Sequence, residues 1–152
     1  MSVAFRRESD EEHLEPKFER PIAPGPNLVT PRGLALIGAK VVELETAVVT
    51  AAPADRDAVA RELRYWHTRQ TTAEVQPTPA EGTVGIGSRV TYRLGGAERT
   101  VEIVGGDEAD PAAGRIGYQA PLARALIGAE VGEHLDFAGK DEAIEVIGVT
   151  GI

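Results

Sequence analysis

Two apolar stripes with heptad spacing, separated by a proline, constrain the fold of this chain more than any other feature of its sequence. In the first stripe the spacings alternate between three and four residues, at Leu34, Ile37, Val41, Leu44 and Val48. The second stripe repeats this rhythm at Val59, Leu63, Trp66, Gln70 and Ala73. Such spacing is typical of helices that pack along one seam. Because Pro53 cannot continue a helix, the stripes predict two antiparallel helices joined by a short turn.

The ends of the two helices are also marked in the sequence. Thr30 suits the N-cap of the first helix because a proline follows it, and that helix is expected to end near Ala52. The second helix is expected to begin at Asp55 or Asp57 and to end before Pro77. At a rise of about 1.5 Å per residue, helices of about 20 residues make a rod on the order of 30 Å long.

The apolar period changes to that of β-strands after residues 77–82, which are rich in proline and read as a linker. Residues 83–152 therefore predict an antiparallel sheet domain with one short helix, which starts at Pro121. The chain is thus expected to be α+β, with a helical hairpin at 30–76 followed by this domain. Residues 1–29 carry four prolines and dense charge, so a flexible arm is expected there. The expected strands are Ser88–Leu94, Thr100–Val104, Arg115–Gln119, His134–Phe137 and Ala143–Val149.

Charge and composition narrow the classes of function. The net charge of −8 argues against a protein that binds nucleic acid by neutralising phosphates, so only indirect contact with nucleic acid is expected. The absence of cysteine excludes disulfides, cysteine-ligated zinc and thiol catalysis. No membrane span and no signal peptide are evident, which favours a cytoplasmic protein. The three histidines are too scattered to indicate a metal site.

Two neighbouring runs in the C-terminal half carry a family resemblance. Residues 103–110 read Ile-Val-Gly-Gly-Asp-Glu-Ala-Asp, and residues 116–128 read Ile-Gly-Tyr-Gln-Ala-Pro-Leu-Ala-Arg-Ala-Leu-Ile-Gly. Together with the helix start at 29–33, the turn at 131–133 and the closing run at 143–149, they resemble, in the same order, the motifs of the GreA/GreB transcription elongation factors.

The resemblance implies a fold and a mode of action. It implies an FKBP-like C-terminal domain that docks at the rim of the secondary channel of bacterial RNA polymerase, and a coiled-coil hairpin that enters this channel. In the family, acidic residues at the hairpin tip help to hold a catalytic Mg²⁺ ion and a water in the polymerase's own active site. Backtracked transcripts are then cleaved and elongation resumes. By this resemblance the chain is a monomer that modulates the polymerase and has neither catalytic residues nor a cofactor of its own.

The candidate site residues fall into two groups. The acidic candidates for the tip are Asp55, Asp57 and Glu62, and the first two would share the polymerase's Mg²⁺ ion. The alternative is that these aspartates cap the second helix and complement its dipole. For the second group, the alternatives are a solvated acidic turn and core packing. The candidates for polymerase binding are Asp107, Glu108, Ala120, Pro121, Leu122, Arg124 and Leu126.

The hairpin departs from the family pattern, and this leaves alternative functions. Cleavage-competent members carry longer helices and a longer acidic tip motif than the turn at 51–57. A non-cleaving regulator similar to the Rnk proteins, with a hairpin too short to reach the active site, is therefore the main alternative. A peptidyl-prolyl isomerase is a third hypothesis because of the FKBP-like domain, although its aromatic pocket would have only Tyr92, Tyr118 and Phe137 to draw on.

Overall fold

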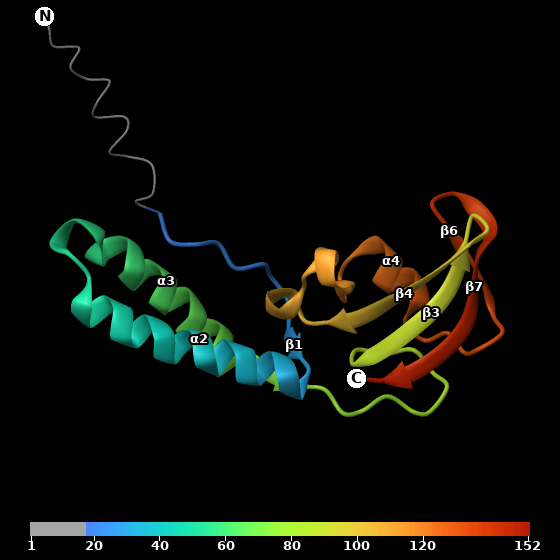
Figure 1. The fold of residues 1–152 in the computed structure, drawn as a ribbon, viewed down its shortest axis with the longest axis horizontal. Coiled ribbons are helices and arrows are strands. Elements are labelled where there is room, and N and C mark those ends of the chain that lie inside the picture. Colours follow the sequence, from blue (N-terminus) through green and yellow to red (C-terminus); the bar gives the residue numbers. More distant parts are fainter. Residues whose placement is uncertain (1–17) are drawn as a thin grey trace, which may run out of the picture. The chain divides into compact units, whose positions relative to one another are not determined.

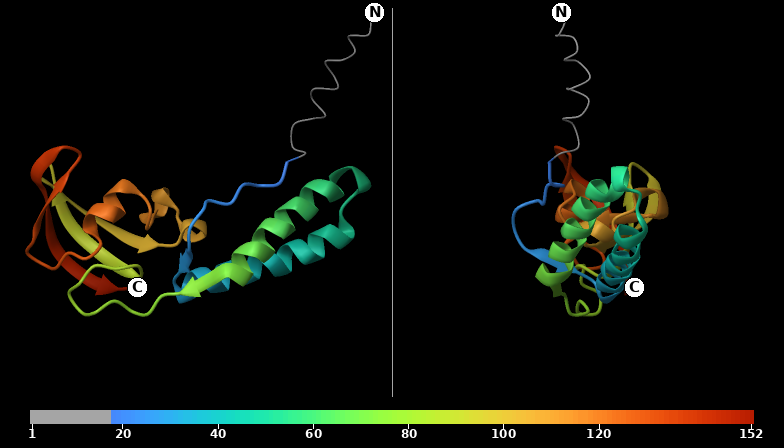
Figure 2. Two further views of the ribbon diagram at one scale, coloured as in Figure 1. Left: turned by 180° about the vertical axis from the view of Figure 1, so that it is seen from behind. Right: turned by 90° about the vertical axis from the view of Figure 1, so that its left-hand side faces the viewer.

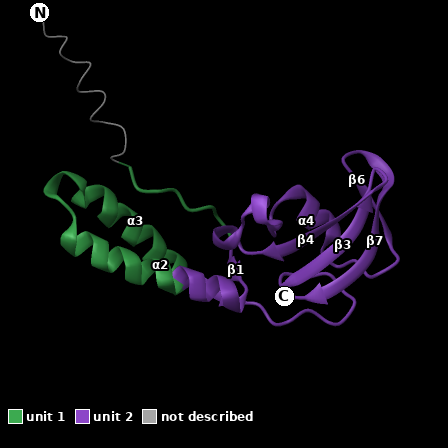
Figure 3. Ribbon diagram, in the orientation of Figure 1, with its two compact units in different colours: residues 1–25, 38–71 green, residues 26–37, 72–152 purple. Residues whose placement is uncertain are grey.

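The computed structural model describes residues 18–152 and divides into two compact units (Figure 3). Of the described residues, the first unit comprises 18–25 and 38–71, and the second comprises 26–37 and 72–152. Most of the arm predicted at residues 1–29 lies outside the described residues. Within residues 18–152, no helix combines the length and apolar character needed to cross a membrane.

Helices α2 (Pro31–Thr50) and α3 (Pro53–Thr72) form the hairpin that the two stripes predict (Figure 1, Figure 2). In the first unit the seam between them buries Val41, Leu44 and Trp66, which all belong to the predicted stripes. Burying such side chains is the main source of stability for a helical pair, because isolated helices of this length are marginal in water. The predicted hairpin is therefore confirmed.

The start of α3 differs from the prediction. The helix begins at Pro53, where a missing N–H costs nothing because the first N–H groups of a helix have no partner inside it. The connecting turn is therefore short, with Ala51 and Ala52 alone between the helices. The helix ends at Thr72, so Ala73 of the predicted stripe belongs to the next strand.

Strands β1 (Asn27–Val29) and β2 (Ala73–Val75), which the sequence analysis did not predict, form a parallel pair in the second unit. Asn27 lies opposite Ala73, and its side-chain amide donates to the hydroxyl of Thr72 over 3.1 Å. β1 comes directly before α2, and β2 directly follows α3. The pair thus fixes the two ends of the hairpin segment next to each other.

The second unit also holds a five-stranded sheet in the order β5-β4-β3-β7-β6. Both glycines of the turn between β3 and β4, Gly95 and Gly96, have positive φ angles of 60° and 80°, which suits a tight hairpin. One strand pair departs from the predicted antiparallel sheet, since β5 runs parallel to β4 after the short 3₁₀ helices η1 (Gly106–Glu108) and η2 (Pro111–Ala113). The strands are β3 (Ser88–Leu94), β4 (Ala97–Val104), β5 (Arg115–Gly117), β6 (His134–Phe137) and β7 (Lys140–Gly151).

The core of the second unit lies between this sheet and the short helix α4 (Pro121–Leu126). Alternate residues of the strands point inward, as the period of two requires. From α4, Ala123 and Leu126 are fully buried in the same cluster. The α+β class is therefore confirmed. The strand residues of this cluster are Val90, Tyr92, Val101, Ile103, Ile144 and Val146.

Candidate functional site

The two tip aspartates lie exposed at the beginning of α3. Asp55 is the third residue of the helix, and its backbone N–H donates to the carbonyl oxygen of Ala52 over 2.8 Å. Asp57 follows two residues later. Because the helix already begins at Pro53, the prediction that either aspartate is the N-cap is wrong. Asp55 does lie in the first turn, where a carboxylate is favoured by the helix dipole.

Glu62, the third tip candidate, is not grouped with the aspartates. It lies seven residues after Asp55, a rise of about 10 Å along a helix. Its carboxylate accepts a hydrogen bond from the Arg20 guanidinium over 2.9 Å. Within residues 18–152, no three His, Cys, Asp or Glu side chains gather in a way that would hold a metal ion.

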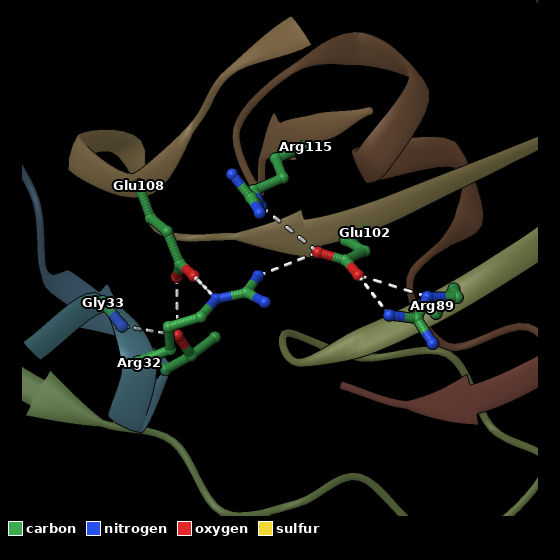
Figure 4. Close-up of polar contacts among 7 residues, drawn as sticks. Arg32, Gly33, Arg89, Glu102, Glu108 and Arg115 are labelled. Atoms are coloured by element: carbon green, nitrogen blue, oxygen red, sulfur yellow. Dashed lines mark hydrogen bonds and ion pairs between the residues drawn. The ribbon is translucent and has the colours of Figure 1, made fainter. Parts of the chain in front are cut away.

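Glu108 lies at the centre of a buried polar contact with the first turn of α2, within the second unit (Figure 4). The Thr30 hydroxyl donates to Glu108 over 2.6 Å and accepts from the backbone N–H of Gly33 over 2.9 Å. Thr30 is thus the N-cap, as predicted. Arg32 donates from Nε to the other Glu108 oxygen. Because Glu108 is only 5% exposed, it positions α2 and offers no surface to a partner.

Glu102 on β4 continues this network, and the sequence analysis missed it. Its carboxylate accepts from Nη2 of Arg32 over 2.8 Å and from Nη2 of Arg89 over 2.6 Å, and it forms an ion pair with Arg115 at 3.4 Å (Figure 4). The hydrogen bond from Arg32, with that from Arg89, outweighs burial and lowers the pKa of Glu102. The same bond raises the pKa of Arg32.

Helix α4 separates the remaining candidates into buried and accessible residues. Leu126 is fully buried and belongs to the core, while Leu122 is half-buried. Ala120 occupies the N-cap in an extended conformation without a side-chain cap, and Pro121 follows at the first position. Arg124 is exposed.

A shallow hollow lies next to α4. It is lined by Pro121, Arg124 and Ala125 of the helix, and by Phe137 and Ala138 at the end of β6. Phe137 and Ala138 were not among the predicted polymerase-binding residues, because they follow α4 in the chain by more than ten residues and share no sequence pattern with it. The hollow combines apolar surface with one guanidinium, which suits a protein partner with apolar and acidic side chains. Asp107 lies in η1 and is half-buried.

The C-terminal part of the chain is similar in sequence to known proteins. Residues 78–150 match the family described as transcription elongation factor GreA/GreB, C-terminal. The transcription elongation factor GreA of Thermomicrobium roseum is 36% identical over 92 residues, which cover 59% of each chain. That of Rhizobium etli is 47% identical over 55 residues, which cover 35% of each chain. The chain thus spans less than two thirds of the length of these relatives.

A solved structure of a prokaryotic transcription elongation factor GreA/GreB from Nitrosomonas europaea is also similar. Its TM-score is 0.41 at 19% identity, over 84% of this chain and 99% of that chain. The matched residues 78–150 include the sheet, α4 and the hollow, and they contain both runs on which the family resemblance was based. Residues 78–150 of this chain are therefore a domain of the GreA/GreB C-terminal family of transcription elongation factors.

Proposed function

We propose that this chain binds bacterial RNA polymerase at its secondary channel and modulates transcript elongation there. The observation that supports this most is the combination, in one chain, of a GreA/GreB C-terminal domain and a two-helix hairpin with exposed aspartates near its tip. Such a factor acts on the polymerase's own reaction and performs none itself. A polymerase partner also implies a cytoplasmic protein, and a chain with a net charge of −8 would touch nucleic acid only indirectly.

The hollow beside α4 is the proposed contact with the polymerase. Pro121 and Phe137 give it apolar area, and Arg124 can pair with a carboxylate of the partner. Ala120 and Leu122 flank this surface, and Asp107 lies on the loop that precedes it. Leu126 is buried in the core and Glu108 is buried against the start of α2, so neither is proposed to touch the polymerase.

The tip supports a role in transcript cleavage. Asp55 and Asp57 carry exposed carboxylates two residues apart, and carboxylate oxygens are the ligands that Mg²⁺ prefers. Presented to the polymerase active site, they would help to hold a second Mg²⁺ ion and orient the attacking water. The factor would then relieve backtracked or arrested complexes.

A second candidate is a polymerase regulator that occupies the channel without promoting cleavage. The observation that favours it is the geometry of the tip. The turn between the helices consists of two alanines, and both aspartates lie behind it on α3. With helices of 20 residues each, the carboxylates would stop short of the metal while the hairpin still obstructs the channel.

Binding to purified core polymerase tests the proposed contact. Arg124→Glu and Phe137→Ala should each weaken binding by about tenfold or more, because truncating a central anchor usually costs that much. Arg99→Glu changes a charge on an exposed residue of β4 and serves as the matched control. Wild-type protein that does not bind the polymerase at all would contradict the proposed function.

A backtracked elongation complex separates the two candidates. If the cleavage role is correct, the protein shortens the transcript, and Asp55→Ala with Asp57→Ala removes this activity while binding persists. If the second candidate is correct, the protein competes with an authentic GreA and no cleavage product appears.

A further inference from the structure

Residues Glu19 and Arg20 are docked on α3, within the first unit. Both carboxylate oxygens of Glu19 accept hydrogen bonds from one guanidinium, from Nε of Arg64 over 2.9 Å and from Nη2 over 2.7 Å. This forked pairing is the most specific geometry that an arginine and a carboxylate can form. The hydrogen bond with Arg64 lowers the pKa of Glu19, which keeps the carboxylate ionised.

Arg20 makes the complementary contact. Its guanidinium lies 4.0 Å from the ring centroid of Tyr65 and 5.6 Å from that of Trp66, and it donates to Glu62 over 2.9 Å. The Glu19 carboxylate therefore faces the guanidinium of Arg64. The next residue, Arg20, faces the Glu62 carboxylate and two aromatic rings of α3. A shift of the arm by one residue would bring like charges together, so the pairing specifies one alignment.

The covered face of α3 is basic and aromatic in a chain with a net charge of −8. Arg61 lies four residues before Tyr65 and Arg69 four residues after it, so both share its face of the helix. Arg69 also approaches the Tyr65 ring, at 5.9 Å. Such a face suits an extended segment with a carboxylate, and Glu19 shows how that carboxylate is held.

The contacts are specific in geometry but weak in strength. The side chains of Glu19 and Arg64 are 59% and 56% exposed, and those of Arg20 and Glu62 are 43% and 41% exposed. Ion pairs at this exposure contribute little to stability and are screened by salt. Because these contacts are weak, a binding partner can displace Glu19 and Arg20 from α3 readily. A segment with a purely structural role would not need to be displaced.

We propose that Glu19 and Arg20 form an autoinhibitory clasp on α3. In the free protein the clasp covers the face of Arg61, Arg64, Tyr65 and Arg69. When the hairpin engages the polymerase, an extended acidic segment of the polymerase takes the place of Glu19. The inference rests on the proposed function for its partner but not for the clasp itself, so the two parts are tested separately.

The clasp is tested without any partner in the full-length chain. Trp66 is the sole tryptophan, so its fluorescence reports directly on the departure of Arg20. Glu19→Arg and Arg64→Glu should each shift the emission, and raising the salt concentration should shift that of the wild type in the same direction. The double variant, which restores the pair with its charges exchanged, should return to the wild-type emission. Lys40→Glu, which alters an exposed ion pair of α2, is the control.

Unchanged Trp66 emission in both single variants, or a double variant that does not recover, would overturn the clasp. Autoinhibition is then tested by polymerase binding. Removing the clasp with Glu19→Ala and Arg20→Ala should raise the affinity by about threefold to tenfold, because a competent state that is only partly populated lowers apparent affinity by that fraction. Arg64→Glu, which damages the face itself, should lower it.

An affinity that stays unchanged or falls when the clasp is removed would overturn the autoinhibitory role. If the wild type does not bind polymerase, the proposed function fails while the fluorescence result still decides whether the clasp forms. The two failures are therefore distinguishable.

Discussion

Arg32, in the first turn of α2, donates to Glu102 on β4 over 2.8 Å across a separation of 70 residues in the chain. The same guanidinium binds Glu108, which also accepts from the N-cap hydroxyl of Thr30. Within the second unit, charged and polar groups thus hold the start of α2 against β4 and η1. Each of these side chains can be replaced separately, so its contribution to stability can be measured.

Replacing Arg32 by alanine should destabilise the protein by about 2 kcal/mol. The change leaves the buried carboxylate of Glu108 with one donor fewer and removes one of the guanidinium groups around Glu102. Urea unfolding followed by circular dichroism measures the loss. Lys40→Ala, on the exposed part of α2, should change the free energy of unfolding by less than about 0.5 kcal/mol. Equal effects of the two substitutions would show that the network does not stabilise the fold.

The hydroxyl of Thr30 should contribute on its own. Thr30→Ala leaves the backbone N–H of Gly33 and a carboxylate oxygen of Glu108 without this partner, and should cost about 1–2 kcal/mol. Thr30→Ser keeps the hydroxyl and should recover most of the loss. The same urea experiment checks both, and a serine variant as unstable as the alanine variant would contradict the assigned cap.

Stability should decrease in acid because of Glu102. Arg32, through its hydrogen bond, and Arg89 hold the pKa of Glu102 below its ordinary value of 4.5, so folding favours the ionised form. This contribution is fully present above pH 4.5 and is lost as the pH falls through the lowered pKa. The melting temperature should therefore drop in that range. Glu102→Gln should give a lower melting temperature at pH 7 and a flatter acid limb, and parallel curves for the two proteins would exclude Glu102 as the cause.

Gly105 should not tolerate a side chain. A Cβ atom there would lie 2.5 Å from the backbone carbonyl oxygen of Leu28, so β1 or the start of η1 would have to move. Gly105→Ala should cost about 2 kcal/mol. The adjacent Gly106→Ala provides the control, because its Cβ would meet no atom within 4 Å. Thermal melting of both variants should show a clear loss for the first and little change for the second.

The parts of the fold that repeat a local pattern could be predicted from the sequence. The heptad stripes specify the hairpin, and Thr30 with its following proline specifies where α2 begins. The alternating strands and the Gly95-Gly96 turn specify most of the sheet. β1 and β2 have three residues each, which is too few for a period to be recognised.

The contacts that depend on distant residues could not be predicted. Glu108 reads as part of a solvated acidic loop, because the residues that bury and pair it, Thr30 and Arg32, lie 78 and 76 positions earlier. Leu126 reads as a possible contact residue because a helix of six residues is too short for its buried face to be assigned. The pairing of Arg20 with Glu62 spans 42 positions and follows no local pattern.

The parallel pairing of β1 with β2 has a consequence for how this protein can vary. Asn27 lies opposite Ala73 and Val29 opposite Val75. The segment that holds α2 and α3 therefore begins and ends at the same strand pair, whatever the length of the two helices. Whole heptads can therefore be added to or deleted from α2 and α3 together, while the core between the five-stranded sheet and α4 is kept. The length of the hairpin can then change during evolution without loss of the β1–β2 pair. It can also be changed by engineering, which would give hairpins of different lengths on the same C-terminal domain.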